Sequence, residues 1–431
     1  MAQPPQFTKI RPGKHLSDVN GSLKPEGTLL GAIDGDHKSV LASLQSKVVS
    51  SSRFAGTRSL PISRNMGVHV REASFADYPQ ICLLEQRYGL EIKDFEEWKH
   101  FWDGNPACAD LPAWPKGWVL EAERGRVVGF LGNVPRSYQF EGRRFVAAAG
   151  HAWVVDSSYR NYAVLLLNPY FRQGNVDVYL CSSANQNSSG ILSVFNSARV
   201  PVGNWDQSIF WVTDCQGFVA SWLRMKDPPA PRMVAGVLSG ALKLEDLFRY
   251  RSSEPSEDES EVECHDNFDS RFDLFWERLM RDKARFFLAV RSREALAWHF
   301  QYALLRKQVW IVTVAGNSGL TGYSVFCRQD NPHYGLRRVR LVDFQVLQGK
   351  DSLLVPMLRY ALSKSRAEGI HMLECVGISS RVRSLVSSLH PRQRQLPSWS
   401  YYYTPANQLL ASRLSAPEVW DPTYFDGDSS L

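Results

Sequence analysis

The sequence lacks the features that mark a membrane protein, a disulfide-rich secreted protein or a zinc protein. It contains no apolar run of about eighteen residues, and its N-terminus has no basic segment followed by an apolar one. Its seven cysteines form no C-x-x-C pair, and most of them lie within apolar runs. We therefore expect a cytoplasmic protein with buried, reduced thiols, no bound metal and no membrane span.

The chain also lacks a strong excess of charge of either sign. Its formal net charge is +6 and its pI is about 8.9. Residues 1–65 hold nine Lys and Arg against four Asp and Glu, and this difference accounts for five of the six net charges. Because this segment has no sustained hydrophobic period, we expect a disordered basic leader. The small excess on the remainder argues against nucleic acid as a partner.

What the chain does contain is enough apolar material for more than one folded domain. Hydrophobic residues make up 44% of its 431 residues and aromatic residues 12%, so the length and composition predict two or three domains. A Pro-rich stretch and a run with seven acidic residues separate two ordered regions. The expected parts are an N-terminal domain at 66–226, a linker with an acidic loop at 227–270, a C-terminal domain at 271–404 and an irregular tail at 405–431.

The hydrophobic pattern of the two regions predicts an α+β, or mixed α/β, fold with mostly antiparallel sheets flanked by helices. In the first region, a strand and two helices precede a hairpin within 117–134. A long strand at 145–156, a helix at 164–174 and a strand at 176–182 follow. The second region repeats this order of hairpin, long strand, helix and strand, at 308–316, 320–329, 335–347, 352–369 and 370–377. We infer a structural repeat, although the two regions share little sequence.

The turn at 157–163, "SSYRNYA", allows two interpretations. A strand that runs into a helix through a polar turn exposes backbone N–H groups at the helix N-terminus, where an anion can bind. Arg160 would add a charged, forked donor to such a site. The other interpretation is a plain connection between two core elements, in which the serines satisfy the turn.

The first region resembles the GNAT superfamily of acyl-CoA-dependent N-acyltransferases. In that family, a long fourth strand ends in a turn that grips the CoA pyrophosphate and begins the next helix. The corresponding segments here are "FVAAAGHAWVVD" (145–156), "SSYRNYA" (157–163) and "VLLLNPYFRQG" (164–174), after a hairpin "GWVLEAERGRVVGFLGNV" (117–134). The second region resembles the same fold, so the resemblance implies a tandem protein with two such domains.

The resemblance implies acetyl-CoA, or another acyl-CoA, as co-substrate and an amine as acceptor, without a metal. The acceptor could be a small amine, an amino sugar or a protein. The residues implied to contact the cofactor are Val154, Val155, Arg160, Asn161, Tyr162, Ala163 and Asn185. Asn185 could instead cap the following helix.

Three residues are candidates for the catalytic proton transfer. His151 lies on the long strand and could act as a base or be a hydrogen-bonded core histidine. Asp156 lies at the end of that strand and could instead cap the turn. Asp343 lies at an apolar position of a strand in the second region, where it needs a partner such as Arg338, Arg340 or Arg359 if it is not a base.

Two departures from the family pattern keep a second function open. Tyr162 and Ala163 stand where glycines are usual around the pyrophosphate, and Phe195 occupies the neighbourhood of the tyrosine that often protonates the leaving thiolate. The alternative to an N-acyltransferase is therefore a catalytically inactive binding protein or acyl-CoA sensor on the same scaffold.

Overall fold

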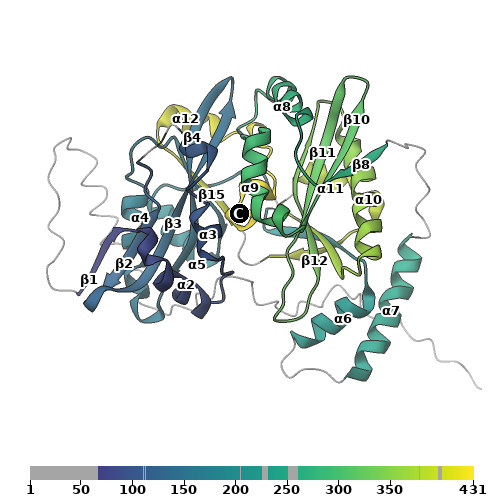
Figure 1. Ribbon diagram of the computed structural model, residues 1–431, viewed down its shortest axis with the longest axis horizontal. Coiled ribbons are helices and arrows are strands. Elements are labelled where there is room, and N and C mark those ends of the chain that lie inside the picture. Colours follow the sequence, from purple (N-terminus) through teal and green to yellow (C-terminus); the bar gives the residue numbers. More distant parts are fainter. Residues whose placement is uncertain are drawn as a thin grey trace, which may run out of the picture.

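The computed structural model describes residues 67–109, 111, 113–203, 205–225, 232–250, 261–377, 379–396 and 400–431. Within this part, the chain forms two sheets that lie side by side, with helices and the C-terminal tail between them (Figure 1). The expected leader at 1–65 and most of the acidic run lie outside the described residues.

The first sheet is mixed, and its centre is a long hairpin. Strands β3 (Arg126–Phe140) and β4 (Arg143–Val155) are antiparallel and are joined by Glu141 and Gly142. Both of these turn residues have positive φ, 51° and 74°, as a tight hairpin turn requires. The remaining strands of this sheet are β1 (Val68–Glu72), β2 (Gly117–Ala122), β5 (Val178–Ala184), β6 (Ala198–Arg199), β9 (Leu288–Ala289) and β15 (Ser400–Pro405).

The second sheet repeats this arrangement. Its hairpin consists of β10 (Val309–Gly316) and β11 (Gly319–Arg328), and β11 pairs with the long strand β12 (Arg338–Val346). Strand β13 (Met372–Val376) then runs parallel to β12, as β5 runs parallel to β4. The other strands are β7 (Gln207–Val212), β8 (Val262–His265) and β14 (Arg392–Gln395). The expected repeat and the α+β class are confirmed.

The helices make layers on both sides of the sheets. On the outer face of the first sheet, α4 (Ala163–Tyr170) and α5 (Gln186–Val194) enclose an apolar core. On the outer face of the second sheet, α10 (Leu354–Ala367) and α11 (Ser380–Leu385) do the same. The inner faces share a core with the elements between the sheets, namely α2 (Tyr78–Arg87), α3 (Phe95–Lys99), α8 (Arg271–Asp282) and α9 (Arg293–Leu305).

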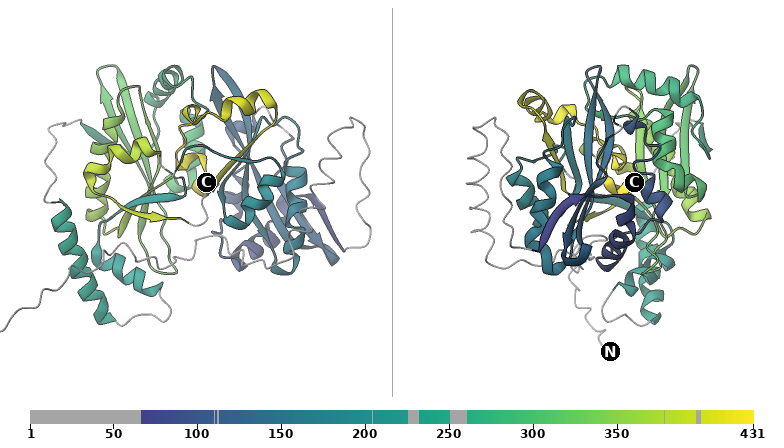
Figure 2. Two further views of the ribbon diagram at one scale, coloured as in Figure 1. Left: turned by 180° about the vertical axis from the view of Figure 1, so that it is seen from behind. Right: turned by 60° about the vertical axis from the view of Figure 1, so that its left-hand side comes forward.

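The two lobes exchange strands near their C-terminal ends. Strand β7, expected in the N-terminal domain, pairs with β13 of the second sheet. Strand β15, expected in the C-terminal domain, pairs with β5 of the first sheet. The C-terminal segment therefore crosses back from the second lobe to the first (Figure 2). The sheets thus divide the chain differently from the expected boundaries at 226 and 404.

The tail at 405–431 is more ordered than expected. It forms α12 (Gln408–Leu414) and several short 3-10 turns, including η10 (Asp428–Ser430). Trp420, Tyr424 and Phe425 are buried in the core that the two lobes share. These large apolar side chains explain why the tail folds into the cleft between the sheets rather than extending into solvent.

Outside the two lobes' layers, α6 (Cys215–Arg224) and α7 (Arg232–Tyr250) pack on each other beside the second lobe (Figure 1). Among the described residues, no helix is long and apolar enough to cross a membrane.

Candidate functional site

The candidate site is a fork between the two parallel strands of the first lobe. Strand β4 pairs with β5 only at Ala147–Ala149, opposite Val178–Leu180. Beyond this point the two strands have no further pairing with each other. Residues 147–149 are buried, whereas Gly150–Trp153 of the same strand are partly exposed. A central strand therefore becomes accessible where its neighbour separates from it.

The backbone of β4 is distorted at the same place. Ala152 has a φ of 51°, and the register between β3 and β4 shifts between Phe130 and Gly132. A non-glycine residue in the left-handed region costs about 1 kcal/mol or more. The close approach of the two strands favours glycine opposite the distortion, because a Cβ at Gly132 would lie 3.0 Å from the carbonyl oxygen of His151. Such irregular strands are frequent next to active sites.

A tyrosine on the outer face of the sheet lies at the point where β4 and β5 separate. The Tyr170 hydroxyl, on α4, lies 2.7 Å from the carbonyl oxygen of Ala148 and 3.1 Å from that of Leu180. It therefore bridges one residue from each of the last two pairs that join β4 and β5. Burial raises the pKa of this phenol well above its ordinary value, so the hydroxyl keeps its proton as a donor.

An aspartate of the tail occupies the other side of the fork. Ser182 and Ser183, on β5 just beyond the fork, donate hydrogen bonds of 2.6 and 2.9 Å to the two carboxylate oxygens of Asp428. The backbone N–H of Asp428 donates in turn to the Ser182 hydroxyl at 2.9 Å. Asp428 is 9% exposed. The sequence analysis missed this residue because its segment had been interpreted as an irregular tail.

His151, a predicted catalytic residue, lies on β4 at the fork. Burial lowers the pKa of its imidazole to about 4, and the charge of Asp428 partly opposes this shift. The ring is therefore neutral at pH 7. Its Nδ1 atom is buried and has no hydrogen-bond partner among the described residues. The ring packs edge-on against Phe101, with 5.0 Å between the centroids.

A second buried polar group lies on the same face of the sheet. Arg136 of β3 donates to the carbonyl oxygen of Phe425 at 2.8 Å, and its guanidinium lies 3.5 Å from Nδ1 of His299 on α9. Burial lowers the pKa of both side chains. Neither Arg136 nor His299 was among the residues predicted from the sequence.

Helix α2 contains a buried carboxyl group, that of Glu85, and its C-terminal end lies at the end of β4. Burial raises the pKa of Glu85 to about 7, while the nearby charge of Lys93 opposes the shift. Its Oε1 atom has no partner in the described part of the chain. Two bonds hold the end of α2 at the end of β4, since Arg87 pairs with Asp156 at 2.8 Å and the Tyr88 hydroxyl accepts from the Ser157 N–H.

The turn after β4 does not present free amides at its start. The N–H of Ser157 donates to Tyr88, that of Ser158 to the Asp156 carboxylate, and that of Tyr159 to the Asp156 carbonyl oxygen. A 3-10 helix, η5 (Ser157–Tyr162), then leads directly into α4. Asp156 is therefore the cap of this turn, which is the alternative to its catalytic role.

The other predicted cofactor contacts are distributed around this turn. Val154 and Val155 are buried, and they pair with Phe130 and Gly129 of the neighbouring strand β3. Asn161 lies within η5, Tyr162 precedes α4 as its N-cap residue, and Ala163 begins α4. The Arg160 guanidinium has no carboxylate partner among the described residues, and its Nε atom is buried without a hydrogen bond.

Asn185 and Asp343 have structural partners. The Asn185 side chain accepts from the N–H of Ser188 and caps α5. Asp343 is fully buried and accepts from Arg291 at 2.9 Å, from Tyr323 at 2.7 Å and from Thr423 at 2.7 Å. Its partner is thus Arg291 rather than the arginines expected from the sequence. The charge and hydrogen bonds of these partners satisfy the carboxylate, so nothing in this geometry favours a role as a base.

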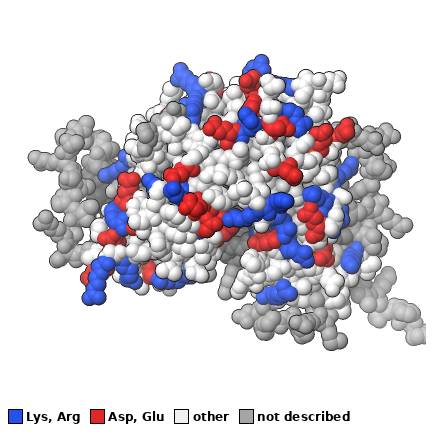
Figure 3. Space-filling model, viewed as in Figure 1, with Lys and Arg blue, Asp and Glu red and all other residues white. Residues whose placement is uncertain are grey.

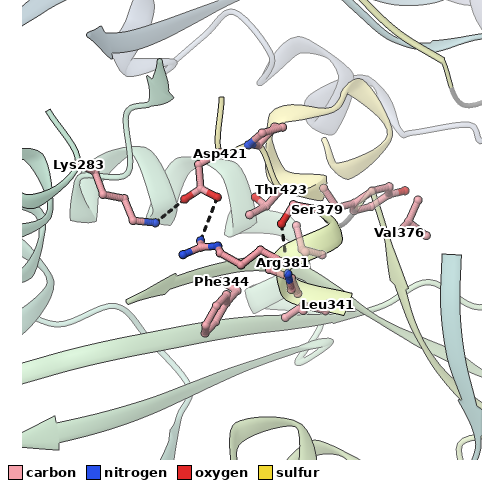
Figure 4. A pocket seen from close by; sticks show the side chains of 12 residues that line it. Lys283, Leu341, Phe344, Val376, Ser379, Arg381, Asp421 and Thr423 are labelled. Atoms are coloured by element: carbon pink, nitrogen blue, oxygen red, sulfur yellow. Dashed lines mark hydrogen bonds and ion pairs between the residues drawn. The ribbon is translucent and has the colours of Figure 1, made fainter. Parts of the chain in front are cut away.

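The fork of the second lobe is filled by the tail. Strands β12 and β13 pair only at Arg338–Leu341 and Met372–Cys375. The pocket beyond them has a volume of about 20 Å³, because Asp421 and Thr423 occupy it (Figure 4). Asp421 lies 2.5 Å from Lys283 and 3.5 Å from Arg381. A volume of this size holds about one water molecule.

A groove of about 690 Å³ opens between α3 and α9, where the two lobes meet. Its lining includes His100 and Trp298, which exchange hydrogen bonds: the Trp298 Nε1–H donates to the His100 carbonyl oxygen, and His100 Nε2 lies 2.9 Å from the Trp298 carbonyl oxygen. The groove is the larger of the two described openings, and it lies next to the core that contains Phe101.

No family model and no curated protein matches this chain. Solved structures do match its fold. Two structures of N-myristoyltransferase from Saccharomyces cerevisiae, one with bound myristoyl-CoA and one with myristoyl-CoA and inhibitors, have TM-scores of 0.51 and 0.50. Both are 11% identical in sequence. They cover 81% of this chain and 81% and 82% of their own.

A GCN5-related N-acetyltransferase from Anabaena variabilis matches with a TM-score of 0.47, 13% identity and coverage of 79% of this chain and 73% of its own. At these identities a likeness concerns the fold alone. The described residues contain no group of three or more His, Cys, Asp or Glu side chains that could hold a metal ion.

Proposed function

Because this chain has the tandem fold of the acyl-CoA N-acyltransferases, we propose that it transfers an acyl group from acyl-CoA to an amine. The observation that supports the proposal is the fork of the first lobe, where β4 loses its partner strand and residues Gly150–Trp153 are partly exposed. The pantetheine arm would lie along this edge, with its thioester near His151.

The chemistry requires little from side chains. Backbone N–H groups on the free edge of β4 would polarise the thioester carbonyl, and positioning of the amine supplies much of the rate. His151 would accept a hydrogen bond from the amine, because its low pKa leaves the ring neutral at pH 7. The acyl group is acetyl in this proposal, since the buried, packed surroundings of Ala149 and Leu180 favour a small group.

The pyrophosphate would be held by side chains more than by the backbone. The first amides of the turn already have partners, whereas Arg160 has no carboxylate partner in the described part of the chain. A guanidinium can bind a phosphate through two parallel hydrogen bonds. This arrangement also agrees with the lack of glycines at Tyr162 and Ala163, because no close backbone approach is needed.

The decisive experiment is calorimetric titration of desulfo-CoA, acetyl-CoA and myristoyl-CoA. We expect Arg160→Ala to weaken binding about tenfold or more, as the loss of a charge-assisted hydrogen bond predicts. Arg172→Ala is the matched control, because Arg172 is an exposed arginine just beyond the other end of α4. An absence of binding to the wild-type protein at millimolar ligand would overturn the proposal.

A second function, an inactive acyl-CoA sensor, is favoured by one observation. The turn amides that would grip a cofactor are already bonded. Release of free CoA thiol in the presence of an amine library separates the two functions, because a sensor binds acyl-CoA without consuming it.

Two further aspects are proposed on compositional grounds. All seven cysteines are free thiols, in keeping with a cytoplasmic location. On the face shown in Figure 3, acidic and basic side chains are interspersed, which argues against nucleic acid as a partner of that face.

A further inference from the structure

Arg136, on β3, is a buried cation whose described contacts are all with neutral groups. The residue is 5% exposed. Its guanidinium donates to the carbonyl oxygen of Phe425 at 2.8 Å, lies 4.7 Å from the centre of the Phe425 ring, and lies 3.5 Å from Nδ1 of His299. Burial and the charge of Arg136 lower the pKa of His299 well below its ordinary value, so that ring is neutral at pH 7. In the part of the chain that the structure describes, Arg136 forms no ion pair.

A neighbouring arginine shows that the same cleft can balance a buried guanidinium. Arg291 is 1% exposed and pairs with Asp343 at 2.9 Å and with Asp426 at 2.8 Å. The charges of Asp426 and Arg291 act on the pKa of Arg136 in opposite directions, so this pair does not balance Arg136. Burying a cation without an opposite charge is costly, and hydrogen bonds to neutral groups offset the cost only in part.

Arg136 lies on the same face of the first sheet as the candidate site. It pairs with Ala147 of β4, and Val134 of β3 pairs with Ala149. Cross-strand partners share one face of a sheet, so the side chains of β4 that lead from Arg136 toward the fork on this face are methyl groups. The exposed end of β4 begins at Gly150, three residues or about 10 Å beyond Ala147. An extended molecule with its amine at the fork would therefore place its other end near Arg136.

We propose that Arg136 binds a carboxylate group of the acceptor. This inference rests on the proposed acyl transfer and adds the acceptor class: an amine that also carries a carboxylate several bonds away, as an ω-amino acid does. The carboxylate would supply the missing opposite charge, because a guanidinium binds a carboxylate through two parallel hydrogen bonds. The contacts with Phe425 and His299 fix the position of the guanidinium.

The site can be tested with a simple probe, n-butyrate, against its uncharged counterpart n-butyramide. The readout is the NMR signal of the His299 ring in histidine-labelled protein, assigned with His299→Gln. In a chloride-free buffer we expect a saturable shift with n-butyrate and none with n-butyramide. In Arg136→Met the apparent dissociation constant should rise about tenfold or more, as the loss of hydrogen bonds to a charged group predicts. Arg136→Lys keeps the charge but not the forked donors, so its loss should be smaller.

Arg143→Met is the matched control, because it removes one positive charge from an exposed position of the neighbouring strand. Its response should equal that of the wild-type protein. The proposal is overturned if wild-type protein gives no saturable response to n-butyrate, if n-butyramide or sodium chloride acts equally well, or if Arg136→Met responds like wild type. The comparison of the probes on wild-type protein stands even if Arg136→Met fails to fold.

The calorimetric titration of acyl-CoA separates this proposal from the function on which it rests. If acyl-CoA does not bind but the n-butyrate response depends on Arg136, the carboxylate site stands and acyl transfer falls. If acyl-CoA binds and the n-butyrate response is absent, acyl transfer stands and the carboxylate site falls. Where both hold, 6-aminohexanoate should be acylated with a lower KM than n-hexylamine, and Arg136→Met should remove this difference. Equal KM values for the two amines in wild-type protein would also overturn the carboxylate site.

Discussion

The two lobes share a fold and both contain paired buried charges, such as Asp77 with Arg71 in the first lobe, but two ionisable groups of the first lobe lack such partners. In the first lobe, buried Glu85 and partly exposed His151 each have a buried polar atom without a partner among the described residues. In the second lobe, Glu374 is fully buried, yet it contacts Arg340 at 2.9 Å and also pairs with Arg394. Buried polar atoms without partners are rare, and groups with perturbed pKa values cluster at functional sites. Glu85 and His151 are therefore the residues of the first lobe whose substitution is most informative.

The pKa values of two buried carboxyl groups, one in each lobe, are shifted in opposite directions. Burial raises the pKa of Glu85 to about 7. Burial would also raise the pKa of Glu374, but the arginines around it hold that pKa well below its ordinary value. One fold thus places a proton-exchanging carboxyl near neutral pH in one lobe and a permanently charged one in the other. The predictions below test this difference, in order of decreasing effect.

The largest effect is expected at the buried network of the second lobe. Arg291→Met removes the one cation that pairs with both Asp343 and Asp426, and the side chains of Arg291 and Asp343 are completely buried. Leaving buried carboxylates without an opposite charge costs about 3–5 kcal/mol, whereas Asp343→Asn should cost less because Asp426 still pairs with Arg291. Urea unfolding should show this loss as a lower free energy of unfolding. If Asp343 were instead held as a catalytic base at a cost to stability, Asp343→Asn would leave the free energy of unfolding unchanged or raise it.

The second prediction concerns pH and the first lobe. The Glu85 carboxyl ionises near 4.5 when unfolded and at about 7 when folded. Its contribution to stability is therefore complete below pH 4.5 and is lost as pH rises to 7, by about 3 kcal/mol in total. Glu85→Gln should remove this decline, measured as the free energy of unfolding at pH 5 and pH 8. Equal pH dependence in both proteins would show that Glu85 is an ordinary acid.

The sequence predicted much of the fold, because hairpins and helices depend on local periodicity. The order of hairpin, long strand, helix and strand was correct in both regions. The exchange of β7 and β15 could not be read from the sequence, because nothing local distinguishes pairing with one sheet from pairing with another. The large aromatic residues Trp420, Tyr424 and Phe425 indicate that the tail is buried. The sequence analysis predicted an irregular tail because it did not take them into account.

The site was less predictable for a related reason. His151 and Arg160 belong to a continuous segment, so a family pattern could point to them. Arg136 and His299 come from distant segments and lie within 3.5 Å of each other, and Asp428 contacts Ser182 from a segment 246 residues away. Asp343 was expected to need a partner, which is confirmed, but Arg291 is separated from it by 52 residues.

The third prediction addresses the vertex of the fork. Tyr170→Phe removes the hydroxyl that bridges the carbonyl oxygens of Ala148 and Leu180. Leaving buried carbonyl groups without this donor should cost about 1–2 kcal/mol in the free energy of unfolding. Amide hydrogen exchange at β5 should also accelerate. If exchange there is unchanged, the hydroxyl does not hold the two strands together.

The smallest effect is expected at the pocket of the second lobe. Arg381 is half exposed and reaches Asp421 only at 3.5 Å, while Lys283 already pairs with that carboxylate. Arg381→Ala should therefore change stability by less than about 1 kcal/mol. Its melting temperature should remain close to that of the wild type. A large loss would mean that the second fork depends on this side chain more than the comparison of the lobes implies.

The exchanged strands have a consequence for how the chain can be divided. A fragment that ends near residue 226 would carry β7, which has no partner strand in the first sheet, and would leave β5 without β15. The complementary fragment would carry β15 without its partner β5 and would leave β13 without β7. We therefore expect that neither half folds on its own and that each alone aggregates through its unpaired strand edges. Produced together, the halves should reassociate, so fragment complementation rather than domain dissection is the way to study the lobes separately.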